Sequence, residues 1–563
     1  MLFIPFSKQN VSMKTTSTSG GHLLVKSLQS LGVKKCFGVP GESYLDVLDA
    51  LHDVKELIQF VLCRNEGGAA FMAEAYGKLT GQPGICMVTR GPGATNASIG
   101  VHTAMQNSTP MILFVGQVGT DVRGREVFQE IDYRAYFGSV AKWVVEIDDA
   151  SRIPEILSRA WTTALSGRPG PVVIALPENM LTAYTNTQPC KPVRIPESAP
   201  QTKHITELTQ LLKKSNKPLV LIGGGGWNAD GCLALEHFAQ QNHLPVAVAF
   251  RFHDLFNNHS DFYVGEAGVG MAPALQSIIR NADLILAIGI RFGEMTTGAY
   301  TLLDVPFANL TLIHSHASDR ELGKVYVSDL PIHASSNQMA LALKDVCVDG
   351  DWIQWQQQNR QAYLAGFDAP TQPGTVDMVE ITKHLRTTLP DDVIVTNGAG
   401  NFAAWPNKFL QYGPKQRLLA PQSGAMGYGL PAAIAAKVVN PNTTVVCFAG
   451  DGDFQMNCQE LGTAMQANAQ PIILILNNGS YGTIRMHQER HYPERVSGTE
   501  LVNPDFVGLA KAYGFHSERV NHTSEFVDAF SRALASDTGA VIELMISTEA
   551  ITPYQTLTQI RNK

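Results

Sequence analysis

The chain has 563 residues, more than one hydrophobic core usually supports, so we expect two to four domains. Hydrophobic residues make up 44% and charged residues 17%, a composition typical of a well-packed globular protein. The formal net charge is −7 and no long basic run occurs, which argues against a nucleic-acid partner. No apolar run reaches the roughly 18 residues that a membrane-spanning helix needs. We therefore expect a soluble cytoplasmic protein with no membrane partner.

The first residues and the cysteines add little to this. The start, MLFIPFSKQNVSMKTT, holds an apolar patch that is too short for a signal peptide, and Met13 is an alternative start. The eight cysteines are scattered without a CxxC pair, so we expect reduced thiols in the cytosol rather than a disulfide or zinc framework.

Short apolar segments that end in turn residues alternate with helical patterns along most of the chain. This alternation predicts an α/β fold whose parallel sheets are covered by helices on both faces. The pattern restarts after a Pro-, Thr- and Gln-rich linker at 183–202 and again after a polar zone at 349–376, so we expect three doubly wound parallel-sheet domains. Their predicted bounds are 14–182, 203–348 and 375–550. The predicted strands lie within 34–41, 57–63, 83–93, 110–117 and 170–177 of the first domain, 217–226, 244–250, 282–293 and 309–318 of the second, and 392–400, 443–453, 471–480 and 539–547 of the third.

Two polar side chains follow two consecutive apolar strands of the third domain. Asp451 comes directly after the first strand and Asn478 follows the next, and the segment 455–469 between them is long enough for one helix. The whole predicts one right-handed βαβ unit with parallel, neighbouring strands. Both side chains should then lie about 5 Å apart at the carboxyl edge of the sheet, where such sheets bind ligands.

A carboxylate and an amide oxygen at this spacing suit Mg²⁺, which prefers about six oxygen ligands and usually takes several from phosphates. Gly450 and Gly452 would let the backbone approach such anionic oxygens, and a helix start near Gln455 would favour negative charge. The pattern therefore indicates a magnesium–diphosphate site. The alternative is that Asp451 caps a helix and Asn478 belongs to an ordinary turn.

The triplet GDG at 450–452, followed one helix later by the pair NN at 477–478, resembles the signature of thiamine diphosphate enzymes. The resemblance covers roughly residues 20–550 and is strongest to acetolactate synthase-like decarboxylases and carboligases, with pyrimidine-binding, central and diphosphate-binding domains. It implies that Asp451, Asn478 and the backbone carbonyl of Ser480 hold the metal. The further cofactor contacts that it implies are Gly400, Asn401, Gly424, Met426, Gly450, Gly452, Asp453, Tyr481 and Gly482. Met426 would bend the cofactor, with core packing as the alternative.

Glu66 ends a predicted strand and opens an apolar helix that begins with small residues. A partly buried Glu at such a place has a raised pKa, which suits hydrogen bonding to the far nitrogen of the cofactor's aminopyrimidine. Glu66 resembles the activating Glu of this family, although on its own it could simply favour a helix N-terminus. Glu74, two turns on, is interpreted as an ordinary helix residue.

Two further residues of the first domain match catalytic positions of the family. Gly41 in FGVPGES would place backbone near the reacting carbon, and Gln129 in FQEID matches an active-site Gln, with a solvated surface amide as the alternative. In this family Glu66 and the metal ligands of one site come from different subunits. The resemblance therefore implies a homodimer, or a dimer of dimers, with the site at the interface.

The chain departs from the acetolactate synthase pattern near the acceptor substrate. The stretch 291–298 reads RFGEMTTG where relatives usually read RFDDRVTG, so Met295 stands in place of an Arg that receives the acceptor carboxylate. His487 replaces a Trp, and Glu42 replaces a Gly.

Two features of the central domain bear on cofactors and metals. Many relatives bind FAD there, and the glycines at 221–226 together with Arg291 leave FAD open for this chain. The segment 314–318, HSHAS, could hold a metal, but solvated histidines at a strand end are the expected reading.

The function implied by the resemblance is a Mg²⁺- and thiamine diphosphate-dependent decarboxylase and carboligase. It would take pyruvate or a related 2-oxo acid as donor and form a C–C bond through an enamine on the cofactor. A simple 2-oxo acid decarboxylase and a lyase or hydrolase of acyloins or diketones stay open. Retention of Glu66 with Asp451 and Asn478 argues against a non-catalytic thiamine-binding protein.

Overall fold

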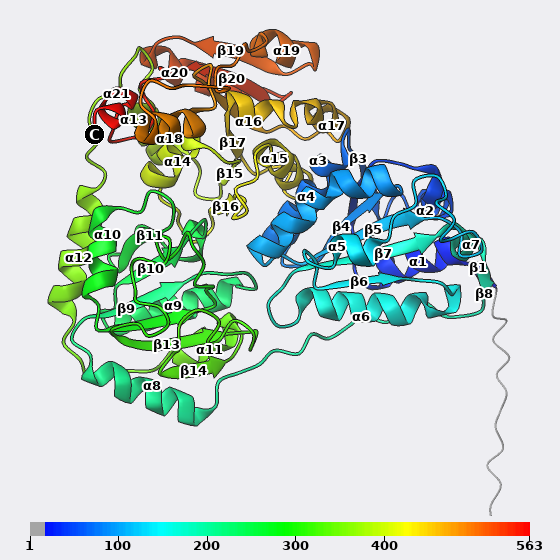
Figure 1. Ribbon diagram of the computed structural model, residues 1–563, viewed down its shortest axis with the longest axis horizontal. Coiled ribbons are helices and arrows are strands. Elements are labelled where there is room, and N and C mark those ends of the chain that lie inside the picture. Colours follow the sequence, from blue (N-terminus) through cyan, green and yellow to red (C-terminus); the bar gives the residue numbers. More distant parts are fainter. Residues whose placement is uncertain (1–16) are drawn as a thin grey trace, which may run out of the picture.

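The structure is a computed structural model that describes residues 17–563, so the alternative start at Met13 lies outside the described residues. Three six-stranded sheets follow one another along the chain, and every strand pair within them is parallel. Figure 1 shows one sheet in each of three lobes, coloured blue to cyan, green, and yellow to red. This confirms the α/β fold of three parallel-sheet domains, while the bounds 14–182, 203–348 and 375–550 stay predictions. Within the described part no helix is long and apolar enough to cross a membrane.

The first sheet has the order β3-β2-β4-β5-β7-β6, and its strands bury alternate side chains on opposite faces. Along β5, Met111 and Leu113 join one hydrophobic core while Ile112 and Phe114 join another. A two-residue pair of β1 (Thr18–Ser19) and β8 (Tyr184–Thr185) ties the start of the domain to the linker. The strands are β2 (Lys35–Gly38), β3 (Gln59–Leu62), β4 (Gly84–Val88), β5 (Met111–Gln117), β6 (Trp143–Glu146) and β7 (Pro171–Pro177), and the helices are α1 (Gly20–Ser30), α2 (Leu45–Asp53), α3 (Glu66–Thr80), α4 (Gly91–Asn107), α5 (Tyr133–Phe137), α6 (Ile153–Leu165) and α7 (Glu178–Thr182).

The central sheet has the order β11-β10-β9-β12-β13-β14 and two cores of its own, one on each face. Its strands are β9 (Pro218–Ile222), β10 (Val246–Ala249), β11 (Tyr263–Ala267), β12 (Leu284–Ile288), β13 (Thr311–His316) and β14 (Leu330–His333). The helices are α8 (Thr202–Lys214), α9 (Ala229–Gln241), α10 (Pro273–Asn281), α11 (Ser336–Leu343) and α12 (Ile353–Ala365).

The third sheet, β16-β15-β17-β18-β20-β19, repeats the strand order of the first. Its strands are β15 (Ile394–Asn397), β16 (Arg417–Leu419), β17 (Val445–Gly450), β18 (Ile472–Asn477), β19 (His516–Val520) and β20 (Ala540–Met545). The helices are α13 (Met378–Thr388), α14 (Ala404–Phe409), α15 (Gly429–Val439), α16 (Asp451–Gln455), α17 (Leu461–Gln466), α18 (Gly482–His491), α19 (Phe506–Ala512), α20 (Phe526–Ala535) and α21 (Leu557–Arg561).

The connection from β17 to β18 is not the single helix expected over 455–469. It starts earlier, at Asp451, and breaks into α16, a 3₁₀ turn at Cys458–Glu460, and α17. Asn457 causes the break, because its backbone leaves the helical region and its amide donates to the carbonyl of Gly427 at 2.8 Å. The prediction of one helix was therefore wrong. The apolar pattern of 455–469 holds no information about the contact between Asn457 and the loop at Gly427.

The strand order places a ligand-binding edge in each domain. The strand order reverses between β2 and β4 in the first sheet and between β15 and β17 in the third. In the central sheet it reverses between β9 and β12. Loops leave such a switch point in opposite directions, and the crevice between them is the usual ligand site of an open α/β sheet.

The first and third domains share one continuous hydrophobic core. Helices α3 and α15 pack side by side, as Figure 1 shows, and Phe71 meets Tyr428 edge to face with ring centroids 5.4 Å apart. The helices are rich in small buried residues, such as Ala69 and Ala70 of α3 and Ala432 of α15, which suits close packing. The two domains therefore form one packed body.

Glu74 lies inside this body and is not the ordinary helix residue that was expected. Its carboxylate is fully buried and accepts hydrogen bonds from Tyr428 Oη at 2.5 Å, Asn107 Nδ2 at 2.7 Å and Thr109 Oγ1 at 2.7 Å. Three donors compensate for its desolvation. The sequence could not show this, because Tyr428 is far away along the chain.

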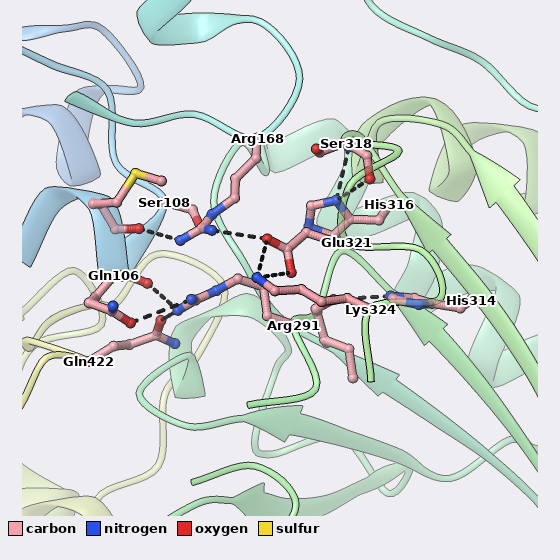
Figure 2. A network of polar contacts seen from close by, with 12 residues as sticks. Gln106, Ser108, Arg168, Arg291, His314, His316, Ser318, Glu321, Lys324 and Gln422 are labelled. Carbon is pink, nitrogen blue, oxygen red and sulfur yellow. Dashed lines mark hydrogen bonds and ion pairs between the residues drawn. The ribbon is translucent and has the colours of Figure 1, made fainter. Parts of the chain in front are cut away.

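A polar network holds the central domain against the other two (Figure 2). Arg168 of the first domain donates to Glu321 Oε1 of the central domain at 3.0 Å. Arg291, after β12, donates to the carbonyl of Gln106 at the end of α4 and to Gln422 Oε1 of the third domain at 3.0 Å. Arg291 belongs to the central domain, so its guanidinium links all three domains.

His314 and His316 lie beside this network and are buried, not solvated as expected (Figure 2). His314 Nε2 lies 3.1 Å from the carbonyl of Ile290, and the backbone N–H of Ser318 donates to His316 Nδ1 at 2.9 Å. Burial lowers the pKa of both imidazoles to about 4, so both are neutral near pH 7. No group of three or more His, Cys, Asp or Glu residues poised for a metal occurs in residues 17–563.

Candidate active site

A cavity of about 1530 Å³ lies where the central and third domains meet, next to the end of α4. The switch points of both sheets open into it, because Gly224 follows β9, Arg291 follows β12, Gly400 follows β15 and Asp451 follows β17. Its volume exceeds the range of about 300–1,000 Å³ that is usual for one small-molecule site. The cavity is therefore the candidate active site.

Asp451 and Asn478 both lie on the wall of this cavity. The strands that carry them, β17 and β18, are parallel neighbours, and Gly450 is paired in register with Leu476. The predicted βαβ unit is thus present, and its two polar ends come out at the same edge of the sheet. Asp451 is the first residue of α16 and does not cap it, since the capping position is Gly450.

Burial raises the pKa of the Asp451 carboxyl, and a hydrogen bond from Asn503 and the N–H groups of Gly452 and Gly479 oppose this rise. Asn503 Nδ2 donates to Asp451 Oδ2 at 2.7 Å and also lies 2.9 Å from Asn477 Oδ1. A cation bound nearby would favour the ionised form of such a desolvated carboxylate. Asn503 had no signal in the sequence, because it reaches this edge from a loop beyond α18.

The loop after β18 turns tightly beneath the cavity. The backbone N–H of Ser480 donates to Asn478 Oδ1 at 3.1 Å, and Ser480 Oγ donates to the carbonyl of Thr499 at 2.9 Å. Tyr481 and Gly482 follow on the cavity wall and lead into α18.

Asp453 is also on the wall, but its carboxylate faces backbone. It accepts from the N–H of Gly427 at 2.9 Å and of Ala399 at 3.1 Å, and so it joins the loops after β15 and before α15. A Cβ at Gly398 would lie 2.1 Å from Asp453 Oδ1, so only glycine fits there. Burial raises the pKa of Asp453 to about 7.

The other residues expected at the cofactor also line the cavity. Gly424 has φ +67° and no neighbour within 4 Å of a would-be Cβ, so backbone faces open space there. Gly452 is crowded instead, since a Cβ would lie 2.5 Å from the ring of Tyr481. Asn401 is committed within the protein, where its Nδ2 donates to the carbonyl of Ile551 at 2.9 Å. The cavity wall includes Gly400, Asn401, Gly424, Met426, Gly450, Gly452, Asp453, Ser480, Tyr481 and Gly482.

The three candidates of the first domain form a separate group. Gly41 follows β2, Glu66 is the first residue of α3, and Gln129 lies in the loop after β5, all at the carboxyl edge of the first sheet. None of the three lines the cavity that the described residues of the same chain enclose. The segment 89–96 contacts all three. The contacts are Thr89 against Gly41, Asn96 Nδ2 to Glu66 Oε2 at 2.9 Å, and the N–H of Gly91 to the carbonyl of Gln129 at 3.0 Å.

Glu460 connects the two groups, and the sequence reading missed it. It lies on the crossover between Asp451 and Asn478 and is fully buried. Its carboxylate accepts from the backbone N–H groups of Arg64 at 3.2 Å and Asn65 at 2.9 Å, directly before Glu66. The Glu460 carboxylate of the third domain therefore holds the turn that precedes Glu66 and α3.

Two of the three residues that depart from the acetolactate synthase pattern lie at the cavity. Met295 and His487 both lie on its wall, while Glu42 sits in a 3₁₀ turn of the first domain. Because residue 295 is a Met, it brings no guanidinium to the cavity wall.

Comparison with known protein families also divides the chain into three domains, one for each of the three sheets. The model of the thiamine pyrophosphate enzyme N-terminal TPP binding domain matches 18–136, that of the central domain matches 205–343, and that of the C-terminal TPP binding domain matches 398–544. The acetolactate synthase isozyme 2 large subunit of Escherichia coli (strain K12) is 31% identical over 521 residues, 92% of this chain and 94% of that protein. The acetolactate synthase large subunit of Lactococcus lactis subsp. lactis (strain IL1403) is 32% identical over 541 residues, with 94% and 93% covered. The acetolactate synthase of Arthrospira platensis is 30% identical over 569 residues, with 96% of each chain covered.

We predict that Glu460→Ala destabilises the protein by about 1–3 kcal/mol, because the N–H groups of Arg64 and Asn65 lose a buried acceptor. The variant should unfold at a lower temperature, as measured by differential scanning calorimetry. The control is Glu380→Ala, an exposed carboxylate on α13 of the same domain, which should stay within about 0.5 kcal/mol of the parent protein. Equal thermal stability of Glu460→Ala and Glu380→Ala would contradict the anchoring contact.

Proposed function

Because the chain belongs to the thiamine pyrophosphate enzyme family, we propose that it decarboxylates a 2-oxo acid and joins the remaining fragment to a second carbonyl compound. The observation that carries this proposal is the pair Asp451 and Asn478 on neighbouring strand ends, facing one cavity. Thiamine diphosphate, the pyrophosphate cofactor of the family, is a cofactor of this chain, and we propose Mg²⁺ as its metal. The protein acts in the cytoplasm.

The residues present fit such a metal and its diphosphate. The Asp451 carboxylate, the Asn478 amide oxygen and the Ser480 carbonyl are hard oxygen donors of the kind that Mg²⁺ takes. Only one of them is charged, so phosphate oxygens complete the shell. The open space beside Gly424 and the first N–H groups of α16 would receive the diphosphate.

When bound, thiamine diphosphate supplies the nucleophilic carbon and the electron sink for decarboxylation. The chain supplies the rest. Glu66 would hold and exchange a proton at the far nitrogen of the aminopyrimidine, Met426 would pack against the bound cofactor, and the cavity wall would limit the access of water to the reacting carbon.

The site forms between two chains. Support comes from the separation of Glu66, Gly41 and Gln129 from the cavity of their own chain, although all three share one exposed sheet edge. A homodimer in which this edge covers the partner's cavity unites the two groups. Packing of α3 against α15 sets the distance between them within each chain.

The proposed acceptor is a second carbonyl compound, as the names of the acetolactate synthase relatives imply for those proteins. The test is a panel of 2-oxo acids offered to enzyme loaded with Mg²⁺ and thiamine diphosphate, with CO₂ release and product mass measured. A larger hydroxyketone product supports carboligation. Aldehyde alone indicates a simple decarboxylase, and no CO₂ from any acid overturns the proposal.

We also propose FAD as a second ligand of the cavity. The central sheet opens into it at the switch between β9 and β12, where dinucleotides bind in sheets of this order, and the cavity has room beyond the metal loop. Gly224 and Arg291 would lie beside it, although Arg291 already donates to Gln106 and Gln422. We expect flavin absorption from the purified protein, and its absence after reconstitution with FAD would contradict this assignment.

We predict that Glu66→Ala lowers turnover by roughly 10²- to 10⁴-fold, since it removes the proton relay. Affinity for thiamine diphosphate, measured by calorimetric titration, should change little because the metal and diphosphate contacts lie in the third domain. The matched control is Glu56→Ala, an exposed carboxylate of the same domain. Near-normal turnover of Glu66→Ala would refute the role of Glu66.

A further inference from the structure

Arg251 is a buried cation without an ion-pair partner among the described residues. It follows β10 in a left-handed backbone conformation with φ +64°, and only 5% of the residue is exposed. Its Nε and Nη1 atoms have no hydrogen-bond partner, and its guanidinium forms no ion pair within residues 17–563. Burial lowers its pKa to about 10, so the group is still positively charged near pH 7.

Other buried arginines of the molecule are engaged. Arg360 donates to the carbonyls of Asn258 and Tyr263 at 3.1 and 2.9 Å, and Arg168 pairs with Glu321. An isolated buried charge costs several kcal/mol, and buried polar groups without partners are rare. Two donor atoms of Arg251 are therefore buried and unsatisfied within residues 17–563, a cost that an anion bound beside the guanidinium would offset.

Two carboxylates, Glu266 and Asp453, act electrostatically on Arg251, but neither accepts a hydrogen bond from its guanidinium in the described structure. Glu266 Oε1 accepts from the N–H of Arg251 at 2.8 Å, which fixes the turn after β10. The guanidinium itself lies over the ring of Phe250, 5.0 Å from the centroid. The turn is thus built to hold the arginine in place while its donors stay free.

Arg251 lies on the wall of the candidate active site, together with Asp451 and Met295. Arg291, on the same wall, spends its donors on Gln106 and Gln422. Met295, also on this wall, brings no charge to it. Arg251 is an arginine of this wall with donors that lack a partner among residues 17–563.

We propose that Arg251 binds the carboxylate of a 2-oxo acid substrate through the fork of its guanidinium. A planar fork matches a carboxylate in a bidentate geometry, which a lysine ammonium does not. This inference rests on the proposed function, since it assigns the anchor of the substrate in the same site. The residues proposed above for the metal and its diphosphate, Asp451, Asn478 and Gly424, lie on other loops of the cavity wall.

The experiment compares acids with their neutral amides. Wild-type enzyme loaded with Mg²⁺ and thiamine diphosphate is titrated calorimetrically with pyruvate, 2-oxobutyrate and phenylglyoxylate, and with the amide of each. We expect at least one acid to bind at least about tenfold more tightly than its amide, because charge-assisted hydrogen bonds contribute strongly. No preference for any acid over its amide overturns the proposal.

Three substitutions test whether Arg251 causes the preference for an acid over its amide. Arg251→Met should abolish it and raise the KM of the best acid roughly 10- to 100-fold with a smaller change in kcat. Arg251→Lys should retain part of it. Arg490→Met removes an exposed arginine from the rim of the same cavity and should keep the preference within about threefold, which separates a direct contact from a general loss of positive potential.

Folding and cofactor binding are measured beside these variants. If Arg251→Met does not fold, Arg251→Lys and the charge-neutral pair Arg251→Met with Glu266→Gln take its place. A fall in thiamine diphosphate affinity with an unchanged acid preference would assign Arg251 to the diphosphate and overturn the proposal. An acid preference that depends on Arg251, in an enzyme that releases no CO₂ from any acid, would uphold this inference while the proposed function fails.

Discussion

Packing of α3 against α15 is the contact on which the rest of the molecule depends. Small residues on both helices let the backbones approach, and the fully buried Glu74 carboxylate binds Tyr428 across the contact at 2.5 Å. The first and third domains therefore behave as one body with one core. This packing sets the separation between the edge that carries Glu66 and the edge that carries Asp451 within the chain.

That distance explains the division of the site. The third domain presents Asp451 and Asn478 to the cavity, and the first presents Glu66, Gly41 and Gln129 elsewhere. Glu460 adds a physical link between them, since it belongs to the crossover between Asp451 and Asn478 and anchors the turn before Glu66. Any movement of that crossover reaches both groups.

The cavity differs from a simple apolar pocket in its polar wall. Arg251 and Asp453 bring charge into a region that burial makes costly for charged groups. Asp453 offsets this with two backbone N–H bonds, whereas the donors of Arg251 are open. Asp453 thus has its partners within the protein, whereas two donors of the Arg251 guanidinium have none among residues 17–563.

Local sequence was enough to predict the three parallel-sheet domains and the placement of Asp451 and Asn478 at one edge. The physical reason is that buried parallel strands read as continuous apolar runs, and one crossover brings consecutive strand ends together. Sequence could not reveal the buried state of Glu74 and His316, the break at Asn457, the anchor Glu460 or the unpaired Arg251. Each of these depends on a partner, or on the lack of one, far along the chain, and only the tertiary structure decides which distant groups meet.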